Sequence, residues 1–177
     1  MNYVYIAASI DGYIATRDSG VAWLHEQPNP NNNDYGYSEF MGNIDALVMG
    51  RHTYEKVRTF GEWHYDKKVF VFSSVLTEVP DELIGKVEFV SGPLKDILSN
   101  VNSQGFNNLY IDGGLVIQSF LAEDLIDELI VTRIPILLGG GIPLFGELSK
   151  PLRFVHRNTK VYDNALVKSH YVRARNA

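Results

Sequence analysis

The sequence of 177 residues contains no cysteine. Without thiol groups the chain cannot form disulfide bonds, hold an iron–sulfur cluster or a cysteine-ligated zinc ion, or use a thiolate nucleophile. Its histidines also lack the spacing of a metal-binding motif such as H-E-x-x-H, so we expect no metal site. Any catalysis must therefore use other groups.

Positive charge and long apolar runs are also scarce. The chain has 16 basic and 21 acidic side chains, which argues against a nucleic-acid-binding surface but leaves room for a local anion site. The best candidate for a membrane span, Leu125–Phe145, is interrupted by Asp127, Glu128 and Arg133. The length and the hydrophobic fraction of 45% fit one globular domain over residues 1–177, which we expect in the cytoplasm.

Short apolar runs alternate with helical patterns along most of the chain. The runs are nearly continuous, which is typical of strands covered on both faces. They are Tyr3–Ala8, Ala46–Met49, Val69–Phe72, Val87–Val90, Leu109–Ile111 and Leu129–Ile136. The helical patterns between them are Asp34–Gly42, Thr53–Phe60, Pro93–Val101 and Leu115–Ala122. This alternation predicts a three-layer α/β/α fold with a mixed, mostly parallel sheet of about eight strands.

The C-terminal part of the chain has a different pattern. Leu152–Tyr162 and Leu166–Arg173 carry β-favouring residues on both sides of Asp163-Asn164. That dipeptide is typical of a tight turn, so we expect the sheet to end in an antiparallel hairpin.

A glycine separates an apolar strand from a helical pattern at Met49-Gly50-Arg51-His52-Thr53. At such a junction the free N–H groups of the first helical turn and the positive end of the helix dipole face outward. Arg51 adds a fork-shaped cation that suits phosphate, and Thr53 adds a hydroxyl group. The junction predicts an anion site for a phosphorylated ligand, although a plain strand-to-helix turn with a surface arginine explains it equally well.

Two further junctions have similar features. Asp112-Gly113-Gly114 lies between a strand and a helix, and its two glycines let the backbone approach a pyrophosphate closely. Ser73-Ser74 follows another buried strand and offers hydroxyl groups to a phosphate. A helix-initiating turn and an ordinary strand end are the simpler explanations. Because the carboxyl ends of parallel strands lie at one edge of a sheet, the junctions together favour a shared ligand site.

In their order along the chain, these segments resemble the dihydrofolate reductase-like superfamily over nearly all 177 residues. Ser9–Ala15 resembles its first strand and the start of its active-site loop, and Trp23 resembles the tryptophan of that loop. Gly50–Glu55 is similar to its nicotinamide-cofactor signature. Ser73-Ser74 is similar to its contact with the adenosine ribose phosphate, and Gly113–Leu121 to its pyrophosphate loop and helix.

Within this superfamily the chain most resembles the reductase domain of riboflavin biosynthesis. Ser9–Ala15 has the Ser-x-Asp-Gly form of that branch, and Asp112 stands where folate reductases usually have glycine. Leu125–Leu129, Pro135–Gly141 and Pro143–Phe145 resemble the branch as well. We expect the deaminase half of the bifunctional riboflavin enzymes to be absent, because the chain lacks the cysteine ligands of its zinc site.

The resemblance implies NADPH as the cofactor. Backbone near Ala7 and Ile14 would hold the carboxamide, and Arg51, His52 and Ser74 would favour the 2′-phosphate of NADPH over NADH. The expected cofactor-binding set is Ala7, Ile14, Gly50, Arg51, His52, Thr53, Ser73, Ser74, Gly113, Gly114, Leu115 and Val116.

Two carboxylates are candidates for the catalytic proton transfer. Asp34 resembles the buried carboxylate that binds the pterin in folate reductases, and a carboxylate in an apolar pocket has a raised pKa that suits proton delivery. Asp34 also fits a helix cap after the asparagine run that precedes it. Asp11 either lines the site as a loop residue or only shapes the turn before Gly12. The resemblance adds Trp23 and Tyr54 as substrate contacts.

The implied activity is the NADPH-dependent reduction of a small heterocycle, and reduction of a phosphoribosylaminopyrimidine is the nearest named reaction. Dihydrofolate reductase is an alternative, because Asp34, Trp23 and the Arg51-His52-Thr53 signature fit it too. The aromatic segment Gly61–Asp66 either stacks on a heterocycle or covers the sheet edge. A nucleotide-binding protein without turnover is a third alternative. The related reductase domains also imply a homodimer.

Overall fold

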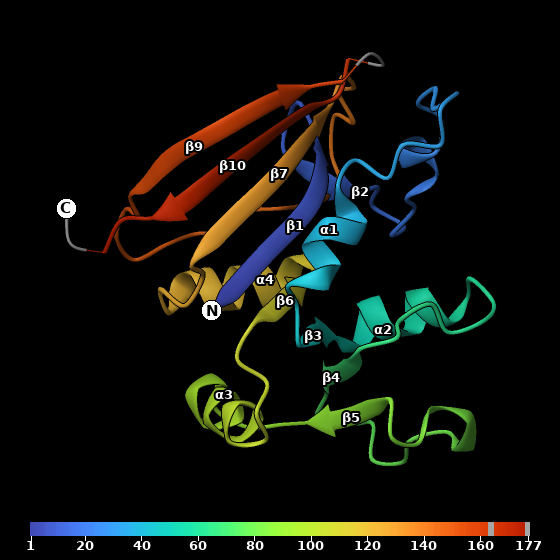
Figure 1. The fold of residues 1–177 in the computed structure, drawn as a ribbon, viewed down its shortest axis with the longest axis vertical. Coiled ribbons are helices and arrows are strands. Elements are labelled where there is room, and N and C mark those ends of the chain that lie inside the picture. Colours follow the sequence, from blue (N-terminus) through green and yellow to red (C-terminus); the bar gives the residue numbers. More distant parts are fainter. Residues whose placement is uncertain (163–164, 176–177) are drawn as a thin grey trace.

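The computed structural model describes residues 1–162 and 165–175, and its main sheet has eight strands in the order β5-β4-β3-β6-β1-β7-β10-β9 (Figure 1). Their bounds are β1 Asn2–Ser9, β3 Ala46–Gly50, β4 Lys68–Phe72, β5 Val87–Val90, β6 Leu109–Asp112, β7 Glu128–Ile134, β9 Phe154–Val161 and β10 Val167–Arg173. Neighbours from β5 to β7 pair in parallel, whereas β10 is antiparallel to β7 and β9. The predicted sheet with its final hairpin is confirmed. The predicted turn Asp163-Asn164 lies outside the described residues.

Helices cover both faces of the sheet. They are α1 Tyr37–Gly42, α2 Arg51–Arg58, α3 Leu94–Ser103 and α4 Gly114–Ala122, with short 3-10 turns η1 Ala22–Leu24 and η2 Asp81–Leu83. α3 and α4 pack on one face, and α1 and α2 pack on the other (Figure 1). The predicted three-layer α/β/α architecture is confirmed. Within the described ranges, no helix has the length and apolar composition that crossing a membrane requires.

The central strand β3 shows why the apolar runs are continuous. Ala46 and Val48 belong to the core cluster that includes α3 and α4, whereas Leu47 and Met49 belong to the cluster that includes α1 and α2. All four side chains are at most 1% exposed. Because successive side chains of a strand point to opposite faces, a strand buried on both faces requires an apolar residue at every position.

Two element boundaries differ from the predicted ones for local reasons. α1 begins at Tyr37 rather than at Asp34, because Gly36 adopts a left-handed φ of +86°. The Asp34 carboxylate accepts hydrogen bonds from the N–H groups of Gly36 and Ser38, at 2.8 and 3.0 Å. Asp34 therefore lies just before the helix rather than within it. β7 ends at Ile134, because the following proline has no N–H to donate to the sheet.

A second, two-stranded sheet was not predicted. β2, Tyr13–Ala15, pairs antiparallel with β8, Ile142–Pro143. Strands of three and two residues are too short to give a hydrophobic period, so the sequence pattern does not indicate them. This small sheet joins the loop after β1 to the loop after β7, beside the carboxyl ends of the parallel strands.

Candidate active site

A cleft of about 900 Å³ lies at the carboxyl ends of β1, β3, β4 and β6. These strands contribute Ala7, Gly50, Phe72 and Asp112 to its walls. Open parallel sheets bind ligands at this edge, and the volume lies within the range of small-molecule and cofactor sites. The cleft is therefore the candidate active site.

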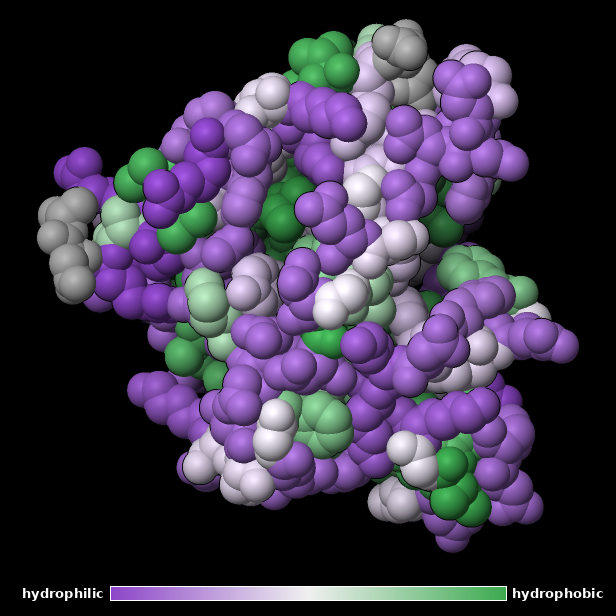
Figure 2. All heavy atoms as spheres, viewed as in Figure 1, coloured by the Kyte–Doolittle hydropathy of each residue, from purple (hydrophilic) through white to green (hydrophobic). Residues whose placement is uncertain are grey.

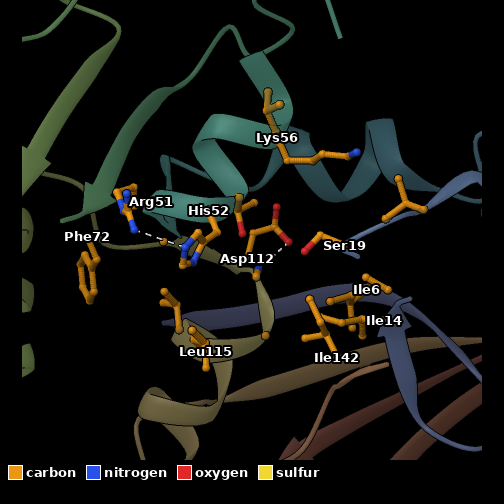
Figure 3. Close-up of a pocket in the computed structure, with 18 of the residues that line it drawn as sticks. Ile6, Ile14, Ser19, Arg51, His52, Lys56, Phe72, Asp112, Leu115 and Ile142 are labelled. Carbon is orange, nitrogen blue, oxygen red and sulfur yellow. Dashed lines mark hydrogen bonds between the residues drawn. The ribbon is translucent and has the colours of Figure 1, made fainter. Parts of the chain in front are cut away.

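The two ends of the cleft differ in chemistry (Figure 3). Arg51 and His52, at the start of α2, form a cationic end. Isoleucines from β1, β2 and β8 form an apolar end, and the carboxylate of Asp112 lies between the two ends. A ligand that fills the cleft would therefore place its anionic part on α2 and its less polar part against β2 and β8.

The first junction, between β3 and α2, supplies the cationic end. Gly50 has an extended backbone, with φ −82° and ψ 163°, and within the described chain no side chain caps the first turn of α2. The N–H groups of this turn are therefore free for an anion. Arg51 Nη1 donates to Glu55 Oε1 at 3.3 Å, and Arg51 Nη2 lies 3.3 Å from His52 Nε2. These contacts hold the guanidinium beside the imidazole.

The second junction, between β6 and α4, lies directly against the first. Gly113 has a left-handed φ of +87°, and a Cβ atom there would lie 2.2 Å from Thr53 Oγ1. A Cβ on Gly114 would lie 3.0 Å from Ile14 Cδ1. Gly113 is thus required by close approach and by its backbone conformation, and a side chain at Gly114 would crowd Ile14. α4 has no side-chain cap among the described residues either, so two helix N-termini meet in one cleft.

Asp112 is the half-buried acid of the cleft. Burial raises the pKa of its carboxyl group to about 6, although the hydrogen bond that Asp112 Oδ1 accepts from the Gly113 N–H, at 2.8 Å, acts in the opposite direction. A carboxyl group with such a pKa is partly protonated near neutral pH. Asp112 is thus able to release or accept a proton under physiological conditions.

Tyrosines from three segments surround Asp112. Burial and the charge of Asp112 raise the pKa of Tyr37 to about 12, and for the same two reasons the pKa values of Tyr65 and Tyr110 lie above the ordinary value. The Tyr110 hydroxyl donates to the carbonyl of Tyr5 at 2.8 Å. These phenols stay protonated at neutral pH, so they add no negative charge near the carboxyl group.

All residues of the expected cofactor set line this one cleft: Ala7, Ile14, Gly50, Arg51, His52, Thr53, Ser73, Ser74, Gly113, Gly114, Leu115 and Val116. The two serines differ in their contacts. Ser73 Oγ accepts hydrogen bonds from the N–H groups of Val75 and Leu76, at 3.2 and 2.9 Å, so it shapes the turn after β4. Ser74 is exposed at the cleft wall.

Asp34, one of the two candidate catalytic residues, does not line the cleft. It is exposed, and the hydrogen bonds from Ser38 and Gly36 lower the pKa of its carboxyl group to about 2. The expected burial and raised pKa of Asp34 are therefore wrong. The helix-cap interpretation describes its contacts, because its carboxylate binds N–H groups that precede and begin α1.

Asp11, the other candidate, also lies outside the cleft wall. Its carboxylate is exposed and accepts hydrogen bonds from the Ser9 hydroxyl and from backbone N–H groups of the loop after β7. These bonds lower the pKa of its carboxyl group, so it is ionised at neutral pH. The expectation that Asp11 lines the site is wrong, and the turn-shaping interpretation fits its contacts.

The two expected substrate contacts lie in the core rather than on the cleft wall. Trp23 is 4% exposed and packs with Ile134, Tyr162 and Leu166. Tyr54 is also 4% exposed, because it packs within the second core cluster. Aromatic side chains in a small α/β domain are large apolar surfaces, and here packing determines their positions.

Several cleft residues were missed by sequence reasoning. Lys56, Val57 and Phe60 line the cleft from α2 and the turn that follows it. Together with Thr53 they have the i, i+3, i+4, i+7 spacing of one helical face, and that spacing would have identified them. Tyr65, from the aromatic segment Gly61–Asp66, also lines the cleft, whereas Trp63 packs against Tyr54 and Tyr65.

Solved structures share this fold. A candidate riboflavin biosynthesis protein from Shewanella sp. PV-4 is 51% identical, with a TM-score of 0.94 over 98% of this chain and 99% of that chain. The diaminohydroxyphosphoribosylaminopyrimidine deaminase/5-amino-6-(5-phosphoribosylamino)uracil reductase of Thermotoga maritima is 18% identical, with a TM-score of 0.74 over 98% of this chain and 56% of that one. Dihydrofolate reductase from Enterococcus faecalis, complexed with NADP(H), is 18% identical, with a TM-score of 0.65 over 98% of this chain and 96% of that chain.

These likenesses define the class of protein: a dihydrofolate reductase-like α/β fold with its ligand cleft at the carboxyl ends of the parallel strands. The family model of the RibD C-terminal domain matches residues 3–168. The chain belongs to the RibD C-terminal domain family, as the resemblance of its motifs predicted.

Proposed function

We propose that this protein is an NADPH-dependent reductase of a small heterocyclic substrate, built as one domain over residues 1–177. The observation that carries the proposal is the convergence of the expected cofactor residues on one cleft, around a half-buried carboxyl group of raised pKa. Membership in the RibD C-terminal domain family supports the reductase class.

The residues of the cleft fit NADPH by their donor chemistry. The N-termini of α2 and α4 offer backbone N–H groups to a pyrophosphate, and among the described residues no side chain caps either terminus. Arg51, His52 and Ser74 offer a guanidinium, an imidazole and a hydroxyl group to the 2′-phosphate. When bound, NADPH supplies a hydride to the substrate.

Asp112 would complete the reduction by supplying a proton. Its Oδ1 atom accepts from the Gly113 N–H, so Oδ2 is the oxygen that carries the proton toward the cleft. The carboxyl group lies between the cationic and the apolar ends, where a substrate beside the nicotinamide would be within reach (Figure 3). The elevated pKa makes the protonated form available near neutral pH.

The nearest named reaction is reduction of the ribosylamino group of a phosphoribosylaminopyrimidine to a ribitylamino group. The name of the Thermotoga maritima neighbour supports this substrate class. The folate alternative loses its main support, because Asp34 is exposed and outside the cleft. NADPH oxidation by purified protein with the phosphoribosylaminopyrimidine and with dihydrofolate separates the two reactions. Tight NADPH binding without turnover on either substrate would favour the nucleotide-binding protein.

Arg51 should determine the preference for NADPH over NADH. Replacing Arg51 with alanine is expected to weaken NADPH binding about tenfold and to leave NADH binding unchanged, since only NADPH carries the 2′-phosphate. Arg58→Ala is the matched control, because Arg58 lies on the same helix with the same 39% side-chain exposure but pairs with Glu82 outside the cleft. Titration calorimetry with both cofactors measures the effect. Equal affinities for NADPH and NADH that persist in Arg51→Ala would contradict it.

We also propose that the protein forms a homodimer through the sheet face near β9 and β10. A hollow of about 260 Å³ opens on β7 and β10, lined in part by Phe145, Phe154 and Tyr171. Val161, on β9, is 67% exposed, and its pairing with Val167 places it on the same sheet face as Ser169 and Tyr171 of this hollow. Hydrophobic side chains lie at both ends of this strand (Figure 2). Light scattering at micromolar concentration should give twice the monomer mass of 19.9 kDa. A monomeric mass would contradict the proposal.

A further inference from the structure

The carboxylate of Asp11 joins two loops that are far apart in the sequence. Asp11 Oδ1 accepts from the Ser9 hydroxyl at 2.6 Å and from the Leu138 N–H at 3.1 Å, and Oδ2 accepts from the Gly139 N–H at 2.8 Å. The buried Ser9 hydroxyl oxygen in turn accepts from the Tyr13 N–H at 2.9 Å. A continuous set of hydrogen bonds therefore connects the first residue of β2 to the loop that leads to β8.

The same two loops touch backbone to backbone beyond Asp11. β2 and β8 are hydrogen-bonded strands, and the Leu144 N–H donates to the Gly12 carbonyl at 2.9 Å. A Cβ atom on Gly141 would lie 2.1 Å from the Ala15 carbonyl oxygen, so no side chain fits between the loops there. A change in the position of the β8 loop would therefore move β2 with it.

This pair of loops builds the apolar end of the cleft. Ile14 and Ala15 from β2 and Ile142 from β8 line the cleft, whereas Asp11 does not. The two isoleucines also touch the start of α4, since a Cβ atom on Gly114 would lie 3.0 Å from Ile14 Cδ1 and 3.3 Å from Ile142 Cγ2. The position of β2 thus determines the width of the cleft between its apolar wall and α4.

We propose that Asp11 is a positioning residue that fixes the β2–β8 wall against the nicotinamide half of the cofactor. This inference rests on the proposed function, because it assumes that the phosphates lie on α2 and α4 and the nicotinamide near Ile14. Asp11 acts from outside the cleft, through Ser9 and the Leu138-Gly139 backbone. It touches neither cofactor nor substrate.

The test compares NADPH with 2′-phospho-ADP-ribose, a fragment that has the phosphates and the adenosine but lacks the nicotinamide. Titration calorimetry on the full chain measures both ligands with wild type, Asp11→Ala, Asp11→Asn and Asp18→Ala. Asp18 is the matched control, because it is an exposed acid on the other side of β2 whose contact is with Thr16 rather than with the β8 loop.

Asp11→Ala is expected to weaken NADPH binding about tenfold, since hydrogen bonds to a charged group are lost, and to change fragment binding less than about twofold. Asp11→Asn keeps an oxygen that accepts hydrogen bonds, so its NADPH affinity should lie between those of Asp11→Ala and the wild type. The NADPH affinity of Asp18→Ala should match that of the wild type. Equal losses for NADPH and the fragment, or no loss for either, would overturn the positioning role. Failure of the wild-type protein to bind NADPH would instead overturn the proposed function, and this role with it.

Discussion

Asp112→Asn should lower the turnover of the reductase about a hundredfold or more, because the side chain that supplies the proton can no longer do so. NADPH affinity should change little, since asparagine keeps an oxygen that accepts from the Gly113 N–H and the phosphate-binding groups lie on other residues. Stopped-flow measurement of NADPH oxidation, beside calorimetry with NADPH, separates the two effects.

The pH dependence of the wild type should have the same origin. The proton donor is the neutral form of Asp112, whose pKa is about 6, so turnover should fall as the pH rises through this value. The turnover of Asp112→Asn should not show this fall near pH 6. A turnover that is unaffected by Asp112→Asn, or that rises between pH 5 and 7 where most of the carboxyl group ionises, would assign the proton to another group.

The same substitution should stabilise the protein at alkaline pH. Because the folded-state pKa of Asp112 lies above its ordinary value of 3.8, its contribution to stability is fully present below that value and is lost as the pH rises through about 6. At pH 8 the buried charge costs up to ~3 kcal/mol, which asparagine does not incur. Denaturant unfolding should therefore show a gain for the variant at pH 8 and none at pH 4.

Gly113→Ala should weaken NADPH binding more than tenfold and destabilise the fold. The new methyl group would lie 2.2 Å from Thr53 Oγ1, and the alanine would have to keep a φ of +87°, which residues other than glycine rarely adopt. Either α4 or α2 must move, and the two helix N-termini would no longer meet. We expect a loss of about 2 kcal/mol or more in unfolding free energy and of more than tenfold in affinity.

Gly105→Ala is the control that separates contact from backbone strain. Gly105 has a similar φ of +95°, but no atom lies within 4 Å of a Cβ atom placed there, and it is remote from the cleft. It should lose about 1 kcal/mol of stability through strain and should bind NADPH like the wild type. If the two alanine variants behave alike in both measurements, the contact between Gly113 and Thr53 has no special role.

The phosphate-binding part of the cleft was predictable because its physical requirements lie in local residues. Gly50 and Gly113 follow apolar strands and precede helices, and an added Cβ atom would crowd Val116 at the first position and Thr53 at the second. The carboxyl ends of parallel strands lie at one edge of the sheet, so Ser74 could be assigned to the same site without knowledge of the strand order, whereas Ala7 was assigned through the family resemblance.

The catalytic acid was not predictable in the same way, because burial is a property of the whole fold. Asp112 has a raised pKa because elements distant in sequence, with Tyr37 and Tyr65 among their residues, enclose it. Asp34 has a lowered pKa because its exposed carboxylate accepts hydrogen bonds from Ser38 and Gly36 at the helix start. Two aspartates that both stand next to a predicted helix start thus have opposite environments. The position of Trp23 in the core is likewise determined by the whole fold and not by its neighbours in the sequence.

A crystal structure of the protein with NADPH tests the central claim most directly. The account predicts phosphates on the backbone N–H groups of α2 and α4, the 2′-phosphate on Arg51, and the nicotinamide ring beside Asp112, between Ala7 and Ile14. Cofactor bound outside this cleft, cofactor bound with its adenosine against Ile14, or an empty cleft at saturating NADPH would each contradict it.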